Sequence, residues 1–244
     1  MVLLDQAWYA GYERSPLHAF NDGAEWLQMD KAGHVFSAYT LGGWGHRLFD
    51  HCGAREGWSL WAGGSVGLIF LSGVELLDGT SAAWGFSWWD MVANVAGAGS
   101  YVAQQRFWNE QRLVFKLSAR PTRYAEQRPD LLGEGLAERV LKDYNGQTIW
   151  LSGNLKDLSG SERLPRWLNL AVGLGAEGMV TADAVAGDGR FRQFYVGPDV
   201  DLTRIQTRSS FLRTVLFVLN GIKFPAPALE IRSTGRVVGH WVYF

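Results

Sequence analysis

The chain has 244 residues and a formal net charge of −1 at pH 7. This balance argues against a nucleic-acid-binding protein, which normally carries a basic surface. The single cysteine, Cys52, excludes an intramolecular disulfide and a thiolate metal cage. Only 19% of the residues are charged, whereas 30 are glycine and 12 are tryptophan. That composition suits close helix packing and contact with an amphipathic boundary such as a lipid interface.

The first residues, Met1–Leu4, are apolar and are followed at once by Asp5. They lack the basic region and the long apolar run of a complete signal peptide, so we expect them to be the tail of a removed or truncated leader. Residues 5–22 mix aromatic residues with turn formers, which predicts an irregular arm.

The first helix is expected to open at Asp22. This aspartate is followed by Glu25 in the spacing of a capping box, in which both side chains accept backbone N–H groups. The pattern predicts a helix over about residues 23–49. On that helix Asp30 and His34 are four residues apart and therefore share a face.

A second helix is expected from Trp58 to Leu77, a stretch whose single charge, Glu75, lies near its end. Its length would permit a membrane-spanning helix. Gly63 and Gly67 supply the spacing of small residues that lets helix backbones approach. A buried helix of a soluble bundle has the same pattern, so both interpretations stay open.

A third helix is expected to begin after Ser87 and to run to about Arg112. Ser87 is predicted to cap it, and Asp90, at the third helical position, to return the hydrogen bond. Capping does not explain Asn94, which stands among apolar neighbours one turn later. Polar residues in such surroundings usually pair across helices.

After residue 112 the composition changes, and we place the main boundary at about residue 123. A short amphipathic helix is predicted from Pro129 to Leu141. From Trp167 to Met179, apolar residues alternate with small or polar ones, which is the period of a strand. The same alternation is typical of outer-membrane strands, with apolar side chains facing lipid and small or polar ones facing inward.

The predicted fold class is therefore α+β. Residues 1–123 should form a helical bundle that could be embedded in a membrane, and residues 124–244 a mainly antiparallel β half with one long helix. The further strands are expected at 148–155, 190–196, 228–231 and 237–244, and the long helix at 209–222.

One constellation of polar residues falls within the most apolar third of the chain. Its candidate members are Asp30, Lys31, His34, Glu75, Asp78, Asp90 and Asn94. Buried charges are costly unless they are paired, so these residues are expected to meet. They could form a structural network, a site for a ligand or lipid head group, or a catalytic site with His34 as general base.

Metal binding is a further alternative, because His34 with Glu75 and Asp90 could bind zinc or a harder cation. No spacing matches HExxH, a P-loop, GxSxG or CxxC, and no metal ion or cofactor is expected. The segment Asp199–Asp201 is interpreted as a turn. The remaining histidines, at 18, 46, 51 and 240, show no partner in the sequence and are expected to be surface or packing residues.

Several separated motifs carry a family resemblance. They are residues 21–34 (NDGAEWLQMDKAGH), 75–81 (ELLDGTS) and 84–97 (WGFSWWDMVANVAG). This set resembles the YfiM-type family of bacterial predicted periplasmic lipoproteins, which carry a domain of unknown function. Residues 142–148 (KDYNGQT) and 224–230 (FPAPALE) resemble its long Bacteroidetes-type form. The D-K-x-x-H, E and D-x-x-x-N pattern is also similar to the VanZ-like helical membrane proteins.

The resemblance implies a protein of the bacterial cell envelope and supplies no reaction. We expect a location at the outer membrane or its periplasmic face, and a membrane lipid or an envelope protein as partner. A non-catalytic, membrane-associated binding module is the favoured function. The alternative is an envelope hydrolase or transferase that uses the buried histidine and carboxylates.

Overall fold

The computed structural model describes residues 12–185, 187 and 189–244. The predicted leader tail, Met1–Leu4, lies outside the described residues. The chain divides into two compact units. The helical unit comprises the chain up to Ala24 and Asp30–Glu110; the sheet unit comprises Glu25–Met29 and Gln111–Phe244. The division after Glu110 comes earlier than the boundary expected at about residue 123. Whether either unit folds as an independent domain stays a prediction.

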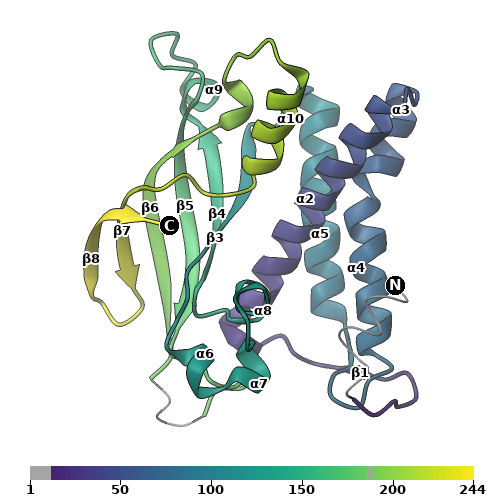
Figure 1. Ribbon diagram of the computed structural model, residues 1–244, viewed down its shortest axis with the longest axis vertical. Coiled ribbons are helices and arrows are strands. Elements are labelled where there is room, and N and C mark those ends of the chain that lie inside the picture. The colour runs from purple at the N-terminus through teal and green to yellow at the C-terminus, as the bar shows by residue number, and fades with distance from the viewer. Residues whose placement is uncertain (1–11, 186, 188) are drawn as a thin grey trace. The chain divides into compact units, whose positions relative to one another are not determined.

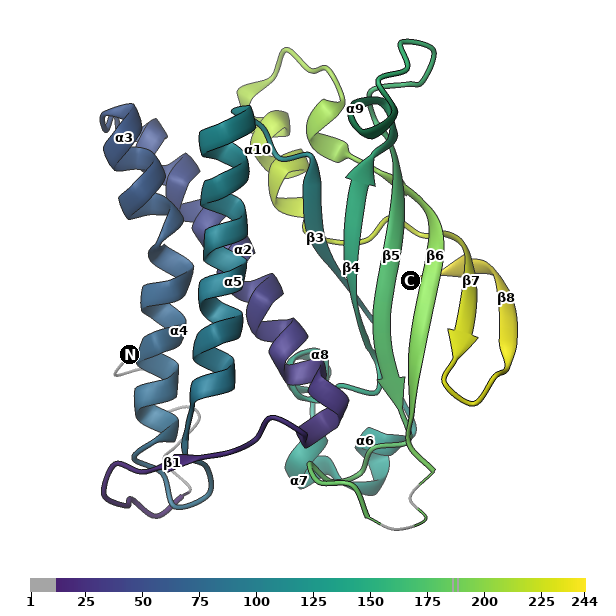
Figure 2. The same cartoon turned by 180° about the vertical axis from the view of Figure 1, so that it is seen from behind.

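The helical unit is built on three long helical segments that run side by side in Figures 1 and 2. They are α2 (Met29–His51), the succession of α3 (Glu56–Trp58), the π-helical η2 (Ser59–Gly63) and α4 (Val66–Asp78), and α5 (Trp88–Trp108). Two short strands, β1 (Ala19–Phe20) and β2 (Phe86–Ser87), pair in parallel at one end.

Glycines set the spacing of these helices. A Cβ atom at Gly67 of α4 would lie 2.3 Å from the carbonyl oxygen of Ala38, and one at Gly97 of α5 would lie 2.3 Å from that of Val35. Both contacts are too short for any side chain, so the backbones of α4 and α5 approach α2 closely only because these positions are glycine.

The helix boundaries differ from those expected at two places. The first helix begins at Met29 and not near residue 23, because Trp26, Leu27 and Gln28 of η1 (Glu25–Gln28) have φ of 47°, 51° and 60°. These are left-handed values that cannot continue into a right-handed helix. The third helix ends at Trp108, where Asn109 (φ 55°) takes the left-handed conformation of a helix cap.

The segment Glu56–Asp78 is long and apolar enough to cross a membrane, judged by length and composition alone. Its most apolar window is 33% buried within the protein. Leu71 of this segment belongs to a core cluster with Ala38 and Ala98, so the helix also serves as a packing element of the helical unit.

The sheet unit confirms the predicted α+β organisation. Strands β3–β8 form one antiparallel sheet in sequence order among the described residues, as Figure 2 shows. The strands are β3 (Leu113–Ala119), β4 (Gln147–Asn154), β5 (Leu168–Glu177), β6 (Phe191–Val200), β7 (Ala226–Arg232) and β8 (Val237–Tyr243). The helical pieces are α6 (Tyr124–Gln127), α7 (Pro129–Leu132), α8 (Leu136–Lys142), α9 (Leu155–Ser159), η3 (Leu202–Arg204) and α10 (Ser210–Leu219).

Two details of this unit were not expected. The single helix predicted from Pro129 to Leu141 is broken into α7 and α8, because Gly133 between them has φ 98°.

The outer edge of β3 is covered by the chain that follows α10. There the Leu117 N–H donates to the Gly221 oxygen (2.8 Å), and the Lys223 N–H donates to the Leu117 oxygen (2.9 Å). Pairing removes an edge that would otherwise invite association.

The sheet curls over its polar face. The hydroxyl groups of Thr148 on β4 and Tyr243 on β8 lie 2.9 Å apart, and Lys116 Nζ on β3 donates to the Val200 oxygen on β6 (2.7 Å). Buried on this inner face are Lys116, Ser152, Asn169, Gln193, Asp199 and Glu230. The opposite face exposes Leu170, Val172, Phe194, Leu229 and Ile231. The inner face also holds an apolar and aromatic cluster: Trp150, Ala171, Tyr195, Ala228 and Tyr243. The sheet therefore departs from the usual arrangement of a water-soluble sheet, because polar side chains are buried inside and apolar ones are exposed outside.

Candidate functional site

The candidate site is a polar cluster inside the helical unit. We define the polar cluster as Asp22, Asp30, Lys31, His34, Glu75, Ser87, Asp90 and Asn94. Asp22 precedes α2, and Asp30, Lys31 and His34 lie on the first turns of that helix. Glu75 comes from the end of α4, and the last three come from the start of α5. The polar cluster thus draws on all three long helices where their polar turns meet.

Lys31 occupies one half of the polar cluster. Its ammonium pairs with Asp22, with Asp30 at 2.7 Å and with Asp90 at 3.0 Å. Burial alone would lower the pKa of Lys31, but these carboxylates outweigh it and hold the pKa above the ordinary value. Lys31 therefore stays charged at neutral pH and acts as the fixed cation of the site.

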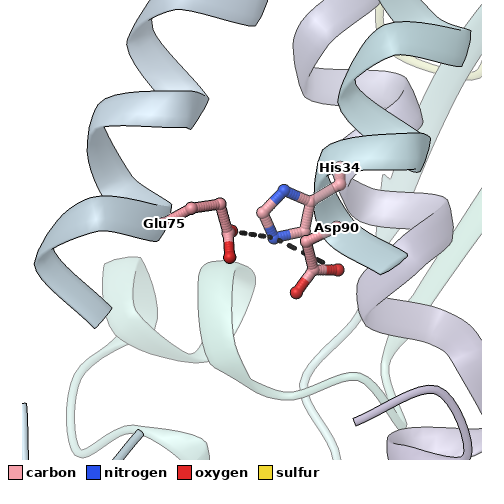
Figure 3. A group of neighbouring side chains, drawn as sticks. All are labelled: His34, Glu75 and Asp90. Carbon is pink, nitrogen blue, oxygen red and sulfur yellow. Dashed lines mark ion pairs between the residues drawn. The ribbon is translucent and has the colours of Figure 1, made fainter. Parts of the chain in front are cut away.

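His34 occupies the other half, between two carboxylates (Figure 3). Its Nδ1 lies 3.0 Å from Asn94 Oδ1. Because an amide oxygen can only accept, Nδ1 carries the proton and donates, so in the neutral imidazole Nε2 presents its lone pair. Nε2 lies 3.8 Å from Glu75 Oε1 and 3.8 Å from Asp90 Oδ1, too far for a direct hydrogen bond.

The two carboxylates beside His34 are unfavourably placed for ionisation. Burial, with a contribution from the charges of Asp90 and Asp78, raises the pKa of Glu75 to about 8. Burial also raises the pKa of Asp90 to about 6, although His34 and Lys31 act in the opposite direction. Glu75 Oε1 has no hydrogen-bond partner among the described residues. With both carboxylates ionised, this half of the site holds more negative charge than its neighbours neutralise.

The predicted capping box at the start of α5 is half right. Ser87 Oγ accepts from the Asp90 N–H at 3.0 Å, as expected of a cap. The Asp90 side chain, however, does not return to the Ser87 N–H, because it turns to Lys31 and His34. Glu75 Oε2 accepts from the Ser87 N–H instead, at 3.2 Å.

Of the residues predicted from the sequence, the structure brings together Asp30, Lys31, His34, Glu75, Asp90 and Asn94. Asp78 is half-buried at the end of α4, and its charge acts on Glu75. Sequence reasoning missed Asp22 and Ser87 as members. Ser87 Oγ donates to Asp22 Oδ1 at 2.6 Å, so Asp22 is a buried partner in the site and not a helix cap.

Two histidines have partners that the sequence did not reveal. His46 Nδ1 lies 2.9 Å from the Tyr101 hydroxyl, and His240 Nε2 lies 2.7 Å from Glu230 Oε2. His46 is buried and packs against the Tyr101 ring, as expected of a packing residue. Tyr101 is 55 residues away in sequence and Glu230 is 10 residues away, and no sequence pattern indicated either pair.

Asp199 is not part of a turn. It lies on β6 with its side chain fully buried, 2.8 Å from Lys116 Nζ and 3.5 Å from Lys223 Nζ. Ser152 Oγ also donates to it at 2.6 Å. The two ammonium groups also donate to backbone oxygens, so every charged group of this set has partners, and the set is interpreted as a structural element of the sheet unit.

The chain was compared with protein families, curated proteins and solved structures. Residues 19–105 match the family described as "Predicted periplasmic lipoprotein (DUF2279)". The match includes every member of the polar cluster and none of strands β3–β8. No curated protein and no solved structure matches the chain.

Similarity to the DUF2279 family supports a place in the bacterial cell envelope, facing the periplasm. It assigns no chemistry to the polar cluster, which is therefore inferred from the geometry. Within the described residues, no hydroxyl or thiol group hydrogen-bonds to His34 Nε2. The arrangement can hold protons or a cation between its carboxylates and its imidazole; it does not present an activated nucleophile.

Proposed function

We propose that the protein is a non-catalytic module of the bacterial cell envelope that attaches to the outer membrane through the apolar outer face of its sheet unit. The observation that carries this proposal is the apolar outer face of that sheet. The inner face buries charged and polar side chains together with an aromatic cluster, whereas the outer face leaves aliphatic and aromatic side chains uncovered. Similarity of residues 19–105 to predicted periplasmic lipoproteins supports the same compartment.

The exposed fractions are large for a face of regular strands. Val172 is 52% exposed, Phe194 47%, and Leu170 and Ile231 44% each. Full burial of such a side chain contributes roughly 1.5–3 kcal/mol. Contiguous apolar patches on soluble proteins usually mark contact with a partner or a membrane. Acyl chains need no hydrogen bonds from this face, and its backbone groups are already paired within the sheet.

Tryptophans of the helical unit support a lipid neighbour. Trp58, Trp61, Trp88 and Trp89 are all exposed. Tryptophan is enriched at the boundary between acyl chains and head groups, because its ring is apolar and its N–H is polar. An envelope protein covering the sheet face is the competing occupant, and the vesicle experiment below distinguishes the two.

The alternative of a hydrolase or transferase has weaker support. His34 Nε2 is a candidate base, but the Ser87 hydroxyl, which belongs to the same polar cluster, donates to Asp22. A nucleophile within hydrogen-bond reach of the base is the usual signature of such chemistry. We therefore keep the non-catalytic function as the conclusion.

The likeness to periplasmic lipoproteins is proposed to continue beyond residue 105. The motifs at residues 142–148 and 224–230 fall at the start of β4 and at the start of β7. They support the long Bacteroidetes-type form, in which the sheet would be part of the same protein type. We also propose that the polar cluster is related to the similar pattern of the VanZ-like helical membrane proteins.

The test is flotation of the purified chain with phosphatidylcholine vesicles. Wild-type protein should float with the vesicles, because its sheet face leaves water. Val172→Lys and Leu229→Lys should each weaken binding by roughly 30- to 900-fold, since a lysine on a lipid-facing strand costs about 2–4 kcal/mol at the bilayer centre.

Thr234→Lys in the exposed β7–β8 turn is the matched control, because it adds the same charge outside the face. It should float like the wild type, and circular dichroism should show that all three variants are folded. Equal flotation of Val172→Lys, Leu229→Lys and Thr234→Lys would overturn the proposal. Absence of wild-type flotation would leave the protein partner as the occupant of the face.

A further inference from the structure

The polar cluster contains two groups of side chains whose ligand atoms are close enough to surround a cation. Asp22, Asp30 and Asp90 form one; His34, Glu75 and Asp90 form the other. The first group is already filled, because all three of its carboxylates pair with Lys31 Nζ. The second group shares Asp90 with the first, and Asp90 Oδ1 lies 3.0 Å from Lys31 Nζ. Its other two members, His34 and Glu75, pair with no cation among the described residues.

The polar cluster contains more carboxylates than fixed cations, so a further cation would stabilise the second group. Asp22, Asp30, Glu75 and Asp90 carry four negative charges when ionised, against the single fixed positive charge of Lys31. Glu75 is 1% exposed, and its Oε1 points toward the His34 ring without a hydrogen bond from a described residue (Figure 3). A buried carboxylate oxygen without a partner is costly, and a bound cation removes that cost.

His34 is oriented as a metal ligand. Its Nδ1–H donates to Asn94 Oδ1, so Nε2 directs a lone pair at the two carboxylates. Metal-binding histidines characteristically donate their second N–H in this way, which fixes the ring and its tautomer. When both carboxylates are ionised and no cation lies between them, the Nε2 lone pair and the carboxylate oxygens repel each other.

The distances are compatible with one ion. Two ligand atoms that bind the same ion with bonds of about 2.1 Å can be at most about 4.2 Å apart. His34 Nε2 lies 3.8 Å from Glu75 Oε1 and 3.8 Å from Asp90 Oδ1, both within this limit. One ligand atom from each of the three residues lies within 4.8 Å of the others, so the side chains need only a small inward movement to bind one ion. The His34 side chain is 20% exposed, which provides a route from solvent.

We propose that His34 Nε2, Glu75 Oε1 and Asp90 Oδ1 bind one divalent transition-metal ion. One imidazole and two carboxylates suit zinc or manganese better than calcium or magnesium, which prefer oxygen ligands throughout. The ion would lower the net negative charge of the polar cluster. It would also tie α2, α4 and α5 together at one point, since each helix supplies one ligand.

The experiment uses the full chain, stripped with EDTA and then titrated with ZnCl₂ and, separately, MnCl₂. Elemental analysis after gel filtration gives the stoichiometry, and calorimetry gives the affinity. Wild type should retain one zinc or manganese ion per chain. Glu75→Gln keeps the shape and removes a charged ligand, so it should lose stoichiometric binding. Asn94→Ala should weaken binding by about 10- to 100-fold, because Asn94 positions the histidine.

Glu56→Gln is the matched control, since it makes the same change at an exposed position at the start of the helical segment that carries Glu75. It should bind one ion with an affinity close to that of the wild type. Circular dichroism confirms folding of every variant. Substitution with cobalt gives a second readout: its visible absorption should report a histidine ligand in the wild type and change in His34→Gln. Wild type without stoichiometric metal, or Glu75→Gln with wild-type affinity, would overturn the proposal.

Discussion

Glu75 is held almost entirely out of water, with neighbours that oppose its ionisation. Its only hydrogen bond from a described residue comes from the Ser87 N–H, and the charges of Asp90 and Asp78 act against it. Burial and these two charges therefore favour the neutral acid over the carboxylate, although the Ser87 N–H acts in the opposite direction. In the absence of metal, the cost of ionising this one side chain should be measurable as a dependence of stability on pH.

The pKa of Glu75 is about 8 in the folded chain, above the ordinary value of 4.5. Between these values the folded state holds one proton more than the unfolded state, so the free energy of unfolding falls as pH rises from about 5 to about 8. In EDTA, Glu75→Gln should remove this contribution and gain stability relative to wild type as the pH increases, by on the order of a few kcal/mol.

Urea titrations of both proteins at several pH values in that range provide the measurement. The difference between the two curves isolates Glu75, because Asp90 titrates in both. Parallel curves for wild type and Glu75→Gln would show that the glutamate is ionised in the folded chain throughout.

At this scale the sequence predicted six members of the polar cluster and missed two. Asp30 and His34 could be found because their spacing of four puts them on one helix face. Asp22 was missed because a local explanation, the capping box with Glu25, accounted for it; its true partners are Lys31 and the remote Ser87. His46 and Tyr101 are likewise 55 residues apart, and no periodic pattern reports such a pair.

Two glycines of α5 show that the neighbouring backbone determines whether a helix position can carry a side chain. α5 carries both Gly97, which faces the backbone of α2, and Gly99, where an added Cβ would meet nothing within 4 Å. The two positions belong to the same helix and have the same intrinsic helix propensity. They differ only in whether another backbone lies next to them, so alanine substitutions at the two positions can be compared directly.

Gly97→Ala should destabilise the helical unit by about 1–3 kcal/mol, because its methyl group would meet the Val35 oxygen at 2.3 Å and force α5 away from α2. Gly99→Ala should instead be neutral or stabilise the unit by up to about 1 kcal/mol, through higher helix propensity. Chemical denaturation followed by circular dichroism measures both. Equal effects of the two substitutions would contradict the close approach of the helices.

For the strands, the sequence was a better guide than for the helix ends. Period-two alternation from residue 168 to 177 predicted β5 because each residue reports which face it occupies. Helix ends depend on single backbone conformations. Gly133 and Asn109 break or end helices through left-handed angles that no hydrophobic period encodes. The pairing of residues 221–223 with β3 is a contact between distant segments and left no local signal.

At the scale of the whole molecule, the chain enters the sheet unit twice. Residues Glu25–Met29 belong to it although the helical unit lies on both sides of them in sequence. Arg192 of β6 holds this short segment: Nη1 donates to the Leu27 oxygen at 2.7 Å, and Nη2 donates to Gln28 Oε1. The Trp26 N–H donates to the Ala182 oxygen at 3.0 Å.

Three consecutive left-handed residues cost of order 1 kcal/mol or more each, and they persist only where other contacts impose them. Arg192→Ala should therefore release residues 25–28 and lower stability by about 1–3 kcal/mol. Hydrogen exchange at Trp26 and limited proteolysis near residue 27 report the release. Arg236→Ala, at an exposed turn, is the control. Unchanged protection of Trp26 in Arg192→Ala would show that this arginine does not hold the segment.

The bond between Arg192 and Leu27 spans 165 residues of chain. At a synthesis rate of 5–20 residues per second, Arg192 leaves the ribosome roughly 8 to 33 s after Leu27. Throughout that interval the left-handed turn has no arginine to hold it, while Asp30 and the rest of α2 are already made. We expect the start of α2 to be the last part of the N-terminal half to become fixed, so a nascent chain stalled before β6 should carry a frayed first helix.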